Sequence, residues 1–461
     1  MKIYIKTRNL ILVVALLVSS LLISCSNFID DPEIQDDPNR ATVVSADLLF
    51  NAMQVRQFSR YEGHTSRTAA IWTQQLAGVD RQAISLGKYD FTESEWNTDM
   101  NSLYSGGGLV DIRNILKETE AKGWRLYSGI AKTWEALTIG MSASLWGDLP
   151  YSEAVGEISN PKLDKQQDIY TAVQTLLDQA IADLTTGGGY KPPNDFVYSA
   201  NTAKWIQAAY TLKARFYLHW AEVNTGNYAL ALSAIQKGIS ANTNNFKTKH
   251  TTVENESSTI YQYWRTRNSD IRAGKYLVDL LTTRNDPRLQ KYFQAGVGSV
   301  AGKFIGVEPG GTLTDASNLS AALRAADYSF DVMTFSEANL IWAECAFKTG
   351  DEATALAKLN AARRAEEGRW ALTANSLGIA TGLTGAALIN AIMEEKYIAL
   401  FMNIEVYNDW KRANRPVVTP FAGGQIPRRL LYSQGERATN PNIPAPSQQP
   451  VRNTNDPGNA Y

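Results

Sequence analysis

The sequence predicts a mainly α-helical protein in which helix pairs form a scaffold and long irregular segments are inserted between them. Three observations predict this class. Apolar residues recur at helical spacing over much of the chain after residue 45. Residues 225–235 align without gaps to residues 349–359, at an offset of 124. Between these stretches, residues 241–268 and 296–333 lose the helical period and are rich in Thr, Asn, Ser and Gly.

Residues 1–24 have the composition of a secretory signal peptide. Three basic residues among the first eight precede an apolar run over residues 10–23, which is shorter than the about 20 residues that a spanning helix needs. Cys25 follows the run directly, and "LISC" resembles the lipobox of bacterial lipoproteins. We therefore expect cleavage before Cys25 and acylation of its thiol, for example by palmitate. The alternatives are an ordinary signal peptide cut nearby and a buried cysteine.

The predicted mature chain divides into a short tether and one helical region. Residues 25–45 are polar and interrupted by proline, as expected of a lipidated tether. Residues 46–461 carry the helical pattern. With 437 of the 461 residues remaining, the mature chain exceeds the size of one ordinary compact core, so one large or two merged domains are expected.

Charge and cysteine content exclude some classes of function. Removing Lys2, Lys6 and Arg8 with the signal segment leaves 42 Lys+Arg against 46 Asp+Glu, a net charge of −4. A nucleic-acid-binding protein needs a basic face, so nucleic acid is not an expected partner. Cys345 lies in the apolar stretch "LIWAECAF" and has no partner once Cys25 is acylated, so we predict that it is a small core residue.

The predicted helices follow in chain order from residue 45. The first covers 45–61, with Ser45 as its N-cap. Apolar residues three and four apart predict further helices within 127–148, 168–184 and 202–223.

The repeated segment comes next. Each copy lies between an aromatic-containing helix and a small-residue helix, Thr-Gly ends the first helix, and alanines let the second pack closely. This arrangement predicts tetratricopeptide-like hairpins with degenerate spacing. Chance similarity between two helical hairpins is the alternative.

Six strings, in order, span nearly the whole mature chain and resemble the SusD/RagB family of outer-membrane nutrient-binding lipoproteins, specifically its SusD-like starch-binding-associated subgroup. The strings are "DDPNRAT" (36–42), "SLWGDLPYSEA" (144–154), "LKARFYLHWAE" (212–222), "FDVMTFSEANLIWAECAFKTGD" (330–351), "IMEEKYIALFMNIEVYNDWKRANRP" (392–416) and "IPRRLLYSQGERATNPNIP" (426–444).

The resemblance implies a SusD-like fold with four tetratricopeptide-like helix pairs. It also implies a lipid anchor in the outer membrane of a Gram-negative cell, facing the exterior. The implied partner is a SusC-type TonB-dependent transporter, on which the protein sits as a lid. The implied ligand is a glycan or oligosaccharide, or in some members a peptide, with no chemistry performed on it. The acidic pair Asp30-Asp31 comes slightly late after Cys25, which leaves the inner leaflet open as an alternative.

Two of these strings have a structural interpretation. In "SLWGDLPYSEA", Gly147 can end a helix and Pro150 prevents its continuation, while Asp148 and Ser152 can bind turn amides. We predict a rigid corner, with ligand contact as the alternative. The arginine pair in "PRR" (427–429) is predicted to tie down the C-terminal loop rather than to bind a carboxylate.

The sequence gives little support for a catalytic site or a metal site. His219 and Glu222 share a helical face and could hold a metal, but a position at the edge of the core is favoured. No GxSxG, HExxH or P-loop pattern occurs. The charged residues within 394–412 are interpreted as ion pairs at the edge of a buried helix hairpin. We therefore expect no enzyme, no cofactor and no metal. A helical-repeat interaction protein of the cell envelope and a lipid-anchored hydrolase are the alternatives.

The ligand site is predicted from chemistry, because the family strings fall on scaffold positions. A sugar can stack its C–H face on a ring that is free of helix packing, beside amides or arginines that bind its hydroxyls. Tyr261 and Tyr263 are expected on one side of an extended segment. Trp96 and Trp264 are the leading candidates for ligand contact, because polar residues surround both in the sequence. The alternative for each ring is that it pins a loop to the helices. The candidates are Trp72, Gln75, Tyr89, Trp96, Asn101, Tyr104, Tyr261, Tyr263, Trp264, Arg265 and Asn268.

Overall fold

Helices dominate residues 44–458, which are the residues that the computed structural model describes. The predicted signal peptide, most of the tether and Cys25 lie outside this range. Residues from Ala46 onward form one unit. Its N-terminal helices are α4 (Ala46–Glu62), α5 (His64–Trp72), α6 (Arg81–Gly87), α7 (Asn97–Tyr104), α8 (Leu109–Ala121), α9 (Arg125–Trp146), α10 (Gln166–Thr186), α11 (Thr202–Leu218) and α12 (Asn227–Ile235).

The C-terminal half contains several short helices and three longer ones, α16 (Phe335–Lys348), α17 (Glu352–Arg369) and α18 (Gly385–Ala399). The short helices are α13 (Thr259–Thr266), α14 (Lys275–Thr283), α15 (Arg288–Tyr292), α19 (Glu405–Ala413) and α20 (Gln434–Thr439). The described 3₁₀ turns are η1 (Glu93–Trp96), η2 (Asn242–Asn244), η3 (Glu254–Glu256), η4 (Gly298–Val300), η5 (Phe421–Gly423) and η6 (Pro446–Gln448).

Strands are short and occur in antiparallel pairs. β1 (Leu76–Gly78) pairs with β3 (Ile271–Ala273), β2 (Phe246–Lys247) with β6 (Asp331–Met333), and β4 (Phe293–Gln294) with β5 (Asn318–Leu319). The predicted mainly α-helical class is therefore confirmed. Within residues 44–458, none of the helices combines the length and the apolar character that a membrane span requires.

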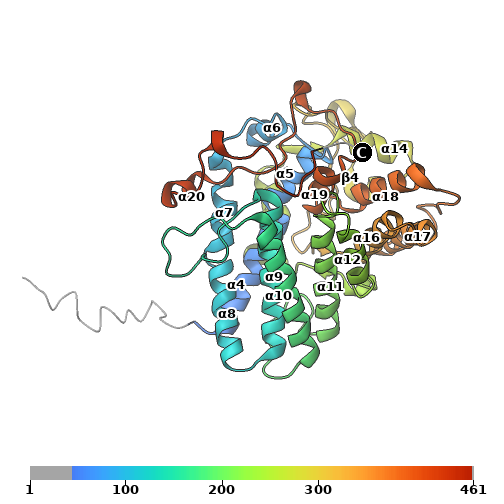
Figure 1. Ribbon diagram of the computed structural model, residues 1–461. Coiled ribbons are helices and arrows are strands. Elements are labelled where there is room, and N and C mark those ends of the chain that lie inside the picture. The colour runs from blue at the N-terminus through green and yellow to red at the C-terminus, as the bar shows by residue number, and fades with distance from the viewer. Residues whose placement is uncertain (1–43, 459–461) are drawn as a thin grey trace, which may run out of the picture. The chain divides into compact units, whose positions relative to one another are not determined.

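The helix α9 lies at the centre of the scaffold. Figure 1 shows it beside α8, α10 and α11, and it packs against all three. Every residue from Leu126 to Trp146 is buried, as expected of a helix that neighbours cover all round. Gly140 permits the close approach of α11, because a Cβ atom there would lie 2.4 Å from the Phe216 ring.

The two repeated stretches form helix pairs, α11 with α12 and α16 with α17, as predicted. The Thr-Gly step differs between them. At the end of α16, Gly350 has a φ of +92°, which suits a glycine after the C-cap. After α11, a turn over residues 219–226 intervenes, and Gly226 (φ −59°) precedes the first residue of α12 instead. The prediction that Thr-Gly ends the first helix is thus wrong for this copy.

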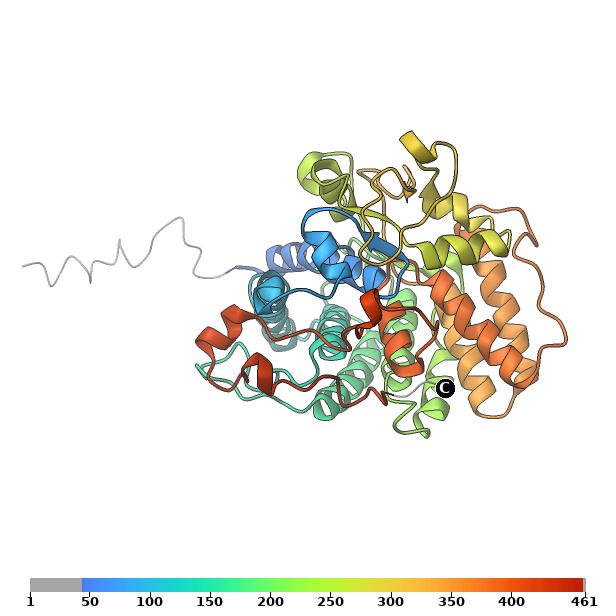
Figure 2. The same cartoon turned by 90° about the horizontal axis from the view of Figure 1, so that it is seen from above.

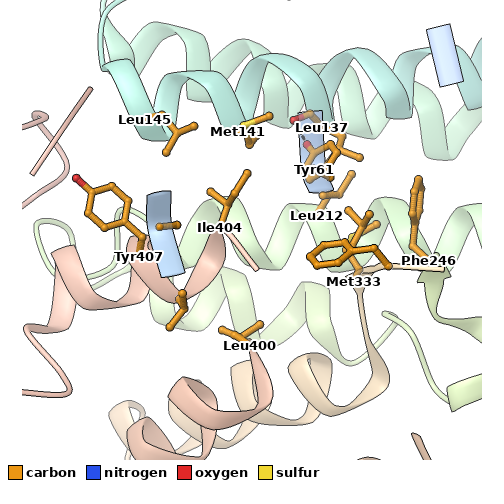
Figure 3. Packing of buried hydrophobic residues seen from close by; sticks show 14 of the residues in the cluster. Tyr61, Leu137, Met141, Leu145, Leu212, Phe246, Met333, Leu400, Ile404 and Tyr407 are labelled. Atoms are coloured by element: carbon orange, nitrogen blue, oxygen red, sulfur yellow. Dashed lines mark hydrogen bonds between the residues drawn. The ribbon is translucent and has the colours of Figure 1, made fainter. Parts of the chain in front are cut away.

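The core joins elements that are distant in sequence. Figure 3 shows Leu137, Met141 and Leu145 of α9 in one packed cluster with residues of α4, α11 and the α18–α19 connection. Seen from above, the helices α16, α17 and α18 group at one side of the unit (Figure 2). A separate apolar cluster fills the space among these three helices.

The ion pairs of Lys396, Asp409 and Arg412 lie inside this packing and not at its edge, which corrects the sequence prediction for them, whereas Glu394 lies at the edge as predicted and pairs with Arg284. Glu344 of α16 accepts hydrogen bonds from Lys396 of α18 (2.8 Å) and from Arg412 of α19 (Nη2, 2.6 Å). Asp409 binds the same two cations. All four residues are buried. The sequence around these charged residues did not indicate that three helices would bring them together in the core.

The corner at residues 147–152 and the arginine pair are structural, as predicted. Gly147 has a φ of +81° and ends α9. Asp148 accepts the backbone N–H of Gln166 at 2.8 Å, but Ser152 acts differently: its amide and hydroxyl both donate to Asp164. The Tyr151 amide donates to Asp164 as well, so two of the corner's amides are held by a carboxylate that sequence reasoning did not identify.

The arginines Arg428 and Arg429 hold the C-terminal segment. Arg428 binds both carboxylate oxygens of Asp456, and Arg429 donates to the carbonyl of Trp146 (2.6 Å) and to that of Pro450 (3.3 Å). In Figure 1 the segment before α20 passes beside the end of α9, where Leu430 N donates to Leu145 O.

His219 and Cys345 are core residues. The His219 ring joins the Tyr170 hydroxyl (2.8 Å) to the Glu405 carboxylate (2.7 Å). Cys345 is fully buried, and burial raises the pKa of its thiol. Glu222 instead receives the Tyr228 hydroxyl, so it does not form a metal pair with His219.

Candidate ligand-binding site

Two of the stretches selected from the sequence meet around α6. The pairing of β1 with β3 places residues 76–78 against residues 271–273, next to α13. Figure 1 shows α6 at the top of the unit. We call the surroundings of this helix the α6 site; it comprises Arg67, Arg81, Gln82, Lys88, Tyr89, Tyr263, Arg267, Asn268, Asp270 and Phe421.

Arg81 begins α6 and connects it to Asp270, the residue before β3. Its Nε donates to Asp270 Oδ1 at 2.6 Å, and the Arg81 side chain remains 47% exposed. Asp80 caps the helix by accepting the Arg81 N–H, and it also accepts the Ser269 hydroxyl. The hydroxyl and then the amide lower the pKa of Asp80. These bonds hold an exposed guanidinium in a defined position.

Tyr263 of α13 lies beside Arg67 and, like Arg81, approaches Asp270. The Arg67 guanidinium carbon is 3.9 Å from the centre of the Tyr263 ring, a cation–π contact. Burial lowers the pKa of Arg67, and its Nη1 has no hydrogen-bond partner among the described residues. Burial also raises the pKa of Tyr263 to about 12, and its hydroxyl is 3.4 Å from Asp270.

Tyr89 and Phe421 form a second aromatic group at the other end of α6. The Phe421 N–H donates to the Tyr89 hydroxyl at 3.3 Å, and Lys88 Nζ is 5.6 Å from the centre of the Phe421 ring. Both rings are half-buried. Gly310 (φ +75°) makes room for Phe421, since a Cβ atom there would lie 2.3 Å from that ring. The seven residues of α6 span about 10 Å, so the two groups flank a short helix.

Several residues around α6 have left-handed backbone conformations. Gln74, Arg81, Tyr89 and Ala422 have φ values of 60°, 46°, 63° and 50°. Such conformations cost about 1–3 kcal/mol each in non-glycine residues and gather at functional sites. Their concentration here favours a ligand-binding role for this surface.

The two leading residues of the sequence prediction are buried, contrary to the expectation that packing leaves their rings free. Trp96 is inaccessible, and its ring lies 5.1 Å from His64, 5.6 Å from Phe91 and 6.0 Å from Trp72. Trp264 is 3% exposed, and its indole N–H donates to Asn318 at 2.8 Å. Packing therefore leaves no exposed face on either ring for a sugar.

Trp72 and Gln75 are also part of the core. Trp72 donates to the Leu86 carbonyl, and the Gln75 amide bridges the backbone of Tyr397 and Met402. Asn101 and Tyr104 lie on α7, where Asn101 accepts the Ser105 hydroxyl and the Tyr104 hydroxyl donates to the Pro150 carbonyl. Trp72, Gln75 and Tyr104 therefore support the scaffold, whereas Asn101 is exposed on α7.

Residues 259–266 form a helix and not an extended segment, which corrects a further prediction. The Ser258 side chain caps it by accepting the Tyr261 N–H. Tyr261 and Tyr263 therefore point about 200° apart around the axis of α13. Arg265 lies over Tyr261 and pairs with Glu254, and Asn268 is exposed. The structure thus brings Tyr89, Tyr263 and Asn268 to the α6 site.

Sequence reasoning missed Arg67, Arg81 and Phe421. The motif "VDR" could have indicated a helix start at Asp80, and "PFAGG" could have indicated a turn at Phe421. Nothing local indicated that these stretches would meet. Among residues 44–458, no group of three His, Cys, Asp or Glu side chains could hold a metal ion. Partly exposed rings beside arginines and amides can bind a polyhydroxylated ligand by stacking and hydrogen bonding.

Comparison with known proteins supports one family. The SusD-like family, described as starch-binding associating with outer membrane, matches residues 38–433. No curated protein matches the sequence.

Among solved structures, a chitin-binding protein is 23% identical, with 87% of this chain and 95% of that one covered and a TM-score of 0.75. A chitin-binding SusD homolog from Flavobacterium johnsoniae is 17% identical, with 90% and 99% covered and a TM-score of 0.78. A SusD/RagB family protein from Bacteroides thetaiotaomicron is 21% identical, with 90% and 100% covered and a TM-score of 0.76. These likenesses show the shared fold, and the family match over most of the sequence shows that the chain belongs to the SusD-like family.

Proposed function

We propose that the protein captures a neutral glycan at the α6 site and delivers it to a SusC-type TonB-dependent transporter, on which it acts as a lid. The observation that carries the proposal is the family match over residues 38–433, a family described as starch-binding associating with outer membrane. The exposed arginine and amide groups and the half-buried rings around α6 supply the matching chemistry. Peptide capture is the alternative, because arginines and rings also bind carboxylates and side chains.

The anchor and the location belong to the same proposal. Residues 1–24 would be removed as a signal peptide, Cys25 would carry the lipid, and residues 25–45 would tether the unit that begins at Ala46. Acyl chains buried at about 0.8 kcal/mol per CH₂ hold such a protein to a membrane. The protein would face the cell exterior and act as a binding protein without catalysis or cofactor.

The test is calorimetry on the chain from Ser26 onward, which retains the whole unit from Ala46. The panel contains N-acetylglucosamine and maltose oligomers, a neutral peptide library and an acidic one. Binding of one glycan class, with the ligand recovered intact, supports the proposal. Binding of peptides alone would replace it with the alternative, and cleavage of a bound glycan would make the protein an enzyme.

Matched variants on α13 test whether the glycan binds on the side of this helix that faces the α6 site. Tyr263→Ala removes the ring that contacts Arg67, whereas Tyr261→Ala removes a tyrosine from the other side of α13. We expect Tyr263→Ala to weaken glycan binding about tenfold, which is 1.4 kcal/mol, and Tyr261→Ala to leave it unchanged. Phe421→Ala tests the opposite end of α6 without touching α13. Equal effects of the two tyrosine variants would place the site elsewhere.

A further inference from the structure

A second pocket opens on the helical scaffold, formed by elements other than those of the α6 site. It has a volume of about 520 Å³ and lies where the start of α10 meets the end of α11. That volume is within the roughly 300–1,000 Å³ typical of small-molecule sites. We call it the scaffold pocket. Its aromatic lining is Tyr170, Phe216, Tyr217 and Trp220.

The polar lining of the scaffold pocket carries no charged side chain. From α10, residues 167, 170, 171 and 174 line it at helical spacing, so one face of this helix supplies a continuous strip. The remaining lining comes from the end of α11, from the turn after it (Val223 among others), from the first residue of α12 and from the C-terminal segment. Amides and hydroxyls supply the polar groups: Gln167, Thr171, Gln174, Asn224, Asn227 and Thr454. An uncharged lining of this kind favours a neutral, hydroxyl-rich ligand over an anion or a cation.

The floor of the pocket is held rigidly. Tyr170 packs edge-on against Phe216 and Trp220, with 5.7 Å between ring centres in each pair. Its hydroxyl is bound to His219, which in turn binds the buried Glu405. Tyr170 and Phe216 are therefore fixed by the core, and a ligand would not have to order them.

Two polar atoms of the lining residues have no hydrogen-bond partner among the described residues. They are the indole Nε1 of Trp220, a donor, and Oε1 of Gln174, an acceptor. The Gln174 amide is already oriented, because its Nε2 donates to the Lys213 carbonyl. Buried groups without partners are costly, so a ligand hydroxyl that reached either atom would form a hydrogen bond that the protein alone does not make.

We propose that the scaffold pocket is a second binding site, which takes one ring of a neutral sugar. The sugar's C–H face would stack in the aromatic lining, and its hydroxyls would pair with the amides of α10 and of the turn after α11. The proposal shares the ligand class of the proposed function but none of its residues, so either can fail alone.

The test follows the indole signal of Trp220 by NMR in the chain from Ser26 onward, labelled with ¹⁵N-tryptophan. Trp220→Phe assigns the signal. The probes are glucose, N-acetylglucosamine, maltotriose and N-acetylglucosamine trimer, each titrated to millimolar concentration. We expect at least one probe to shift this signal in a saturable way.

Matched variants decide whether the pocket is responsible. Tyr217→Ala removes a half-buried tyrosine that lines the pocket, and Tyr210→Ala removes a half-buried tyrosine two turns earlier on α11 that does not. Thr171→Trp fills the pocket from an exposed position. We expect Tyr217→Ala and Thr171→Trp to weaken the titration at least tenfold, and Tyr210→Ala and Phe421→Ala to leave it unchanged.

Three results would overturn the scaffold site: no probe shifts the Trp220 signal, Thr171→Trp titrates like the unmodified chain, or Tyr210→Ala and Tyr217→Ala have equal effects. If any of these results is found and Phe421→Ala abolishes calorimetric binding, the proposed function is still supported. If the probes still shift the Trp220 signal and Phe421→Ala does not change calorimetric binding, the result would support the scaffold pocket. It would exclude the α6 site as a binding site.

Discussion

At the residue scale, Lys411 shows how a buried charge responds to its surroundings. Its Nζ donates to the Ser144 carbonyl and lies 4.6 Å from the centre of the Tyr407 ring. Burial lowers the pKa of Lys411 to about 7, although Asp456 and Glu405 oppose the shift. Between pH 7 and about 10.5, the unfolded chain holds a proton that the folded chain lacks. The free energy of unfolding contributed by Lys411 therefore rises with pH across this range.

Lys411→Met removes this titration. We expect the difference in unfolding free energy, unmodified chain minus Lys411→Met, to increase by roughly 2 kcal/mol from pH 7 to pH 9. Urea unfolding at several pH values measures it. Lys191→Met, which removes an exposed lysine, reports the general effect of losing one charge. A difference that stays constant with pH would show that Lys411 is charged in the folded protein.

Single residues also mark the limit of prediction from sequence. Trp96 stands in "SEWNTD", and its polar neighbours suggested an exposed ring. Two of those neighbours, Glu95 and Asp99, instead bind His64, whose ring lies against the buried Trp96. Local polarity reports what surrounds a residue along the chain, whereas burial depends on which distant segments pack over it.

At the element scale, helices could be predicted where apolar residues recur at helical spacing over a long stretch. The short helix α13 could not be predicted in this way. Its signals were present, since Ser258 is a good N-cap and the buried Ile260 and Trp264 are four residues apart, but eight residues are too few to distinguish a helix from an extended segment. The helix pairs α11–α12 and α16–α17 were visible through their repeat. Their charged partners were not, because Glu344, Lys396 and Arg412 meet only after α16, α18 and α19 have packed.

Glu344 is the centre of that interaction. Burial alone would raise the pKa of Glu344, but Arg412 and Lys396 outweigh it and lower the pKa to about 2. We expect Glu344→Gln to cost about 3–5 kcal/mol of stability, because it leaves buried cations short of a counter-charge.

Glu394→Gln is the matched control, since this side chain is 42% exposed and pairs with Arg284. It should cost at most about 1 kcal/mol. Chemical denaturation measures both variants. Similar costs for the two would mean that the helices α16, α18 and α19 are held by apolar packing alone.

At the scale of the whole molecule, the proposed role joins a tethered N-terminus to a helical unit that binds a ligand. Cys25→Ala tests the tether. We expect the variant to fold, because Cys25 precedes the unit that begins at Ala46, and to leave the membrane fraction of cells that lack the transporter. Copurification with a barrel transporter in mild detergent tests the lid role. Retention of Cys25→Ala in the membrane fraction would rule out lipid as the anchor, and recovery of the unmodified protein alone would rule out the lid.

The central claim is that a neutral glycan binds around α6. The most direct measurement is a crystal structure of the chain from Ser26 onward with the oligosaccharide that the calorimetric screen identifies. The account predicts a sugar ring against Tyr263 or Phe421, with hydrogen bonds from Arg81 or Arg67. A bound oligosaccharide that contacts none of these four residues would contradict it.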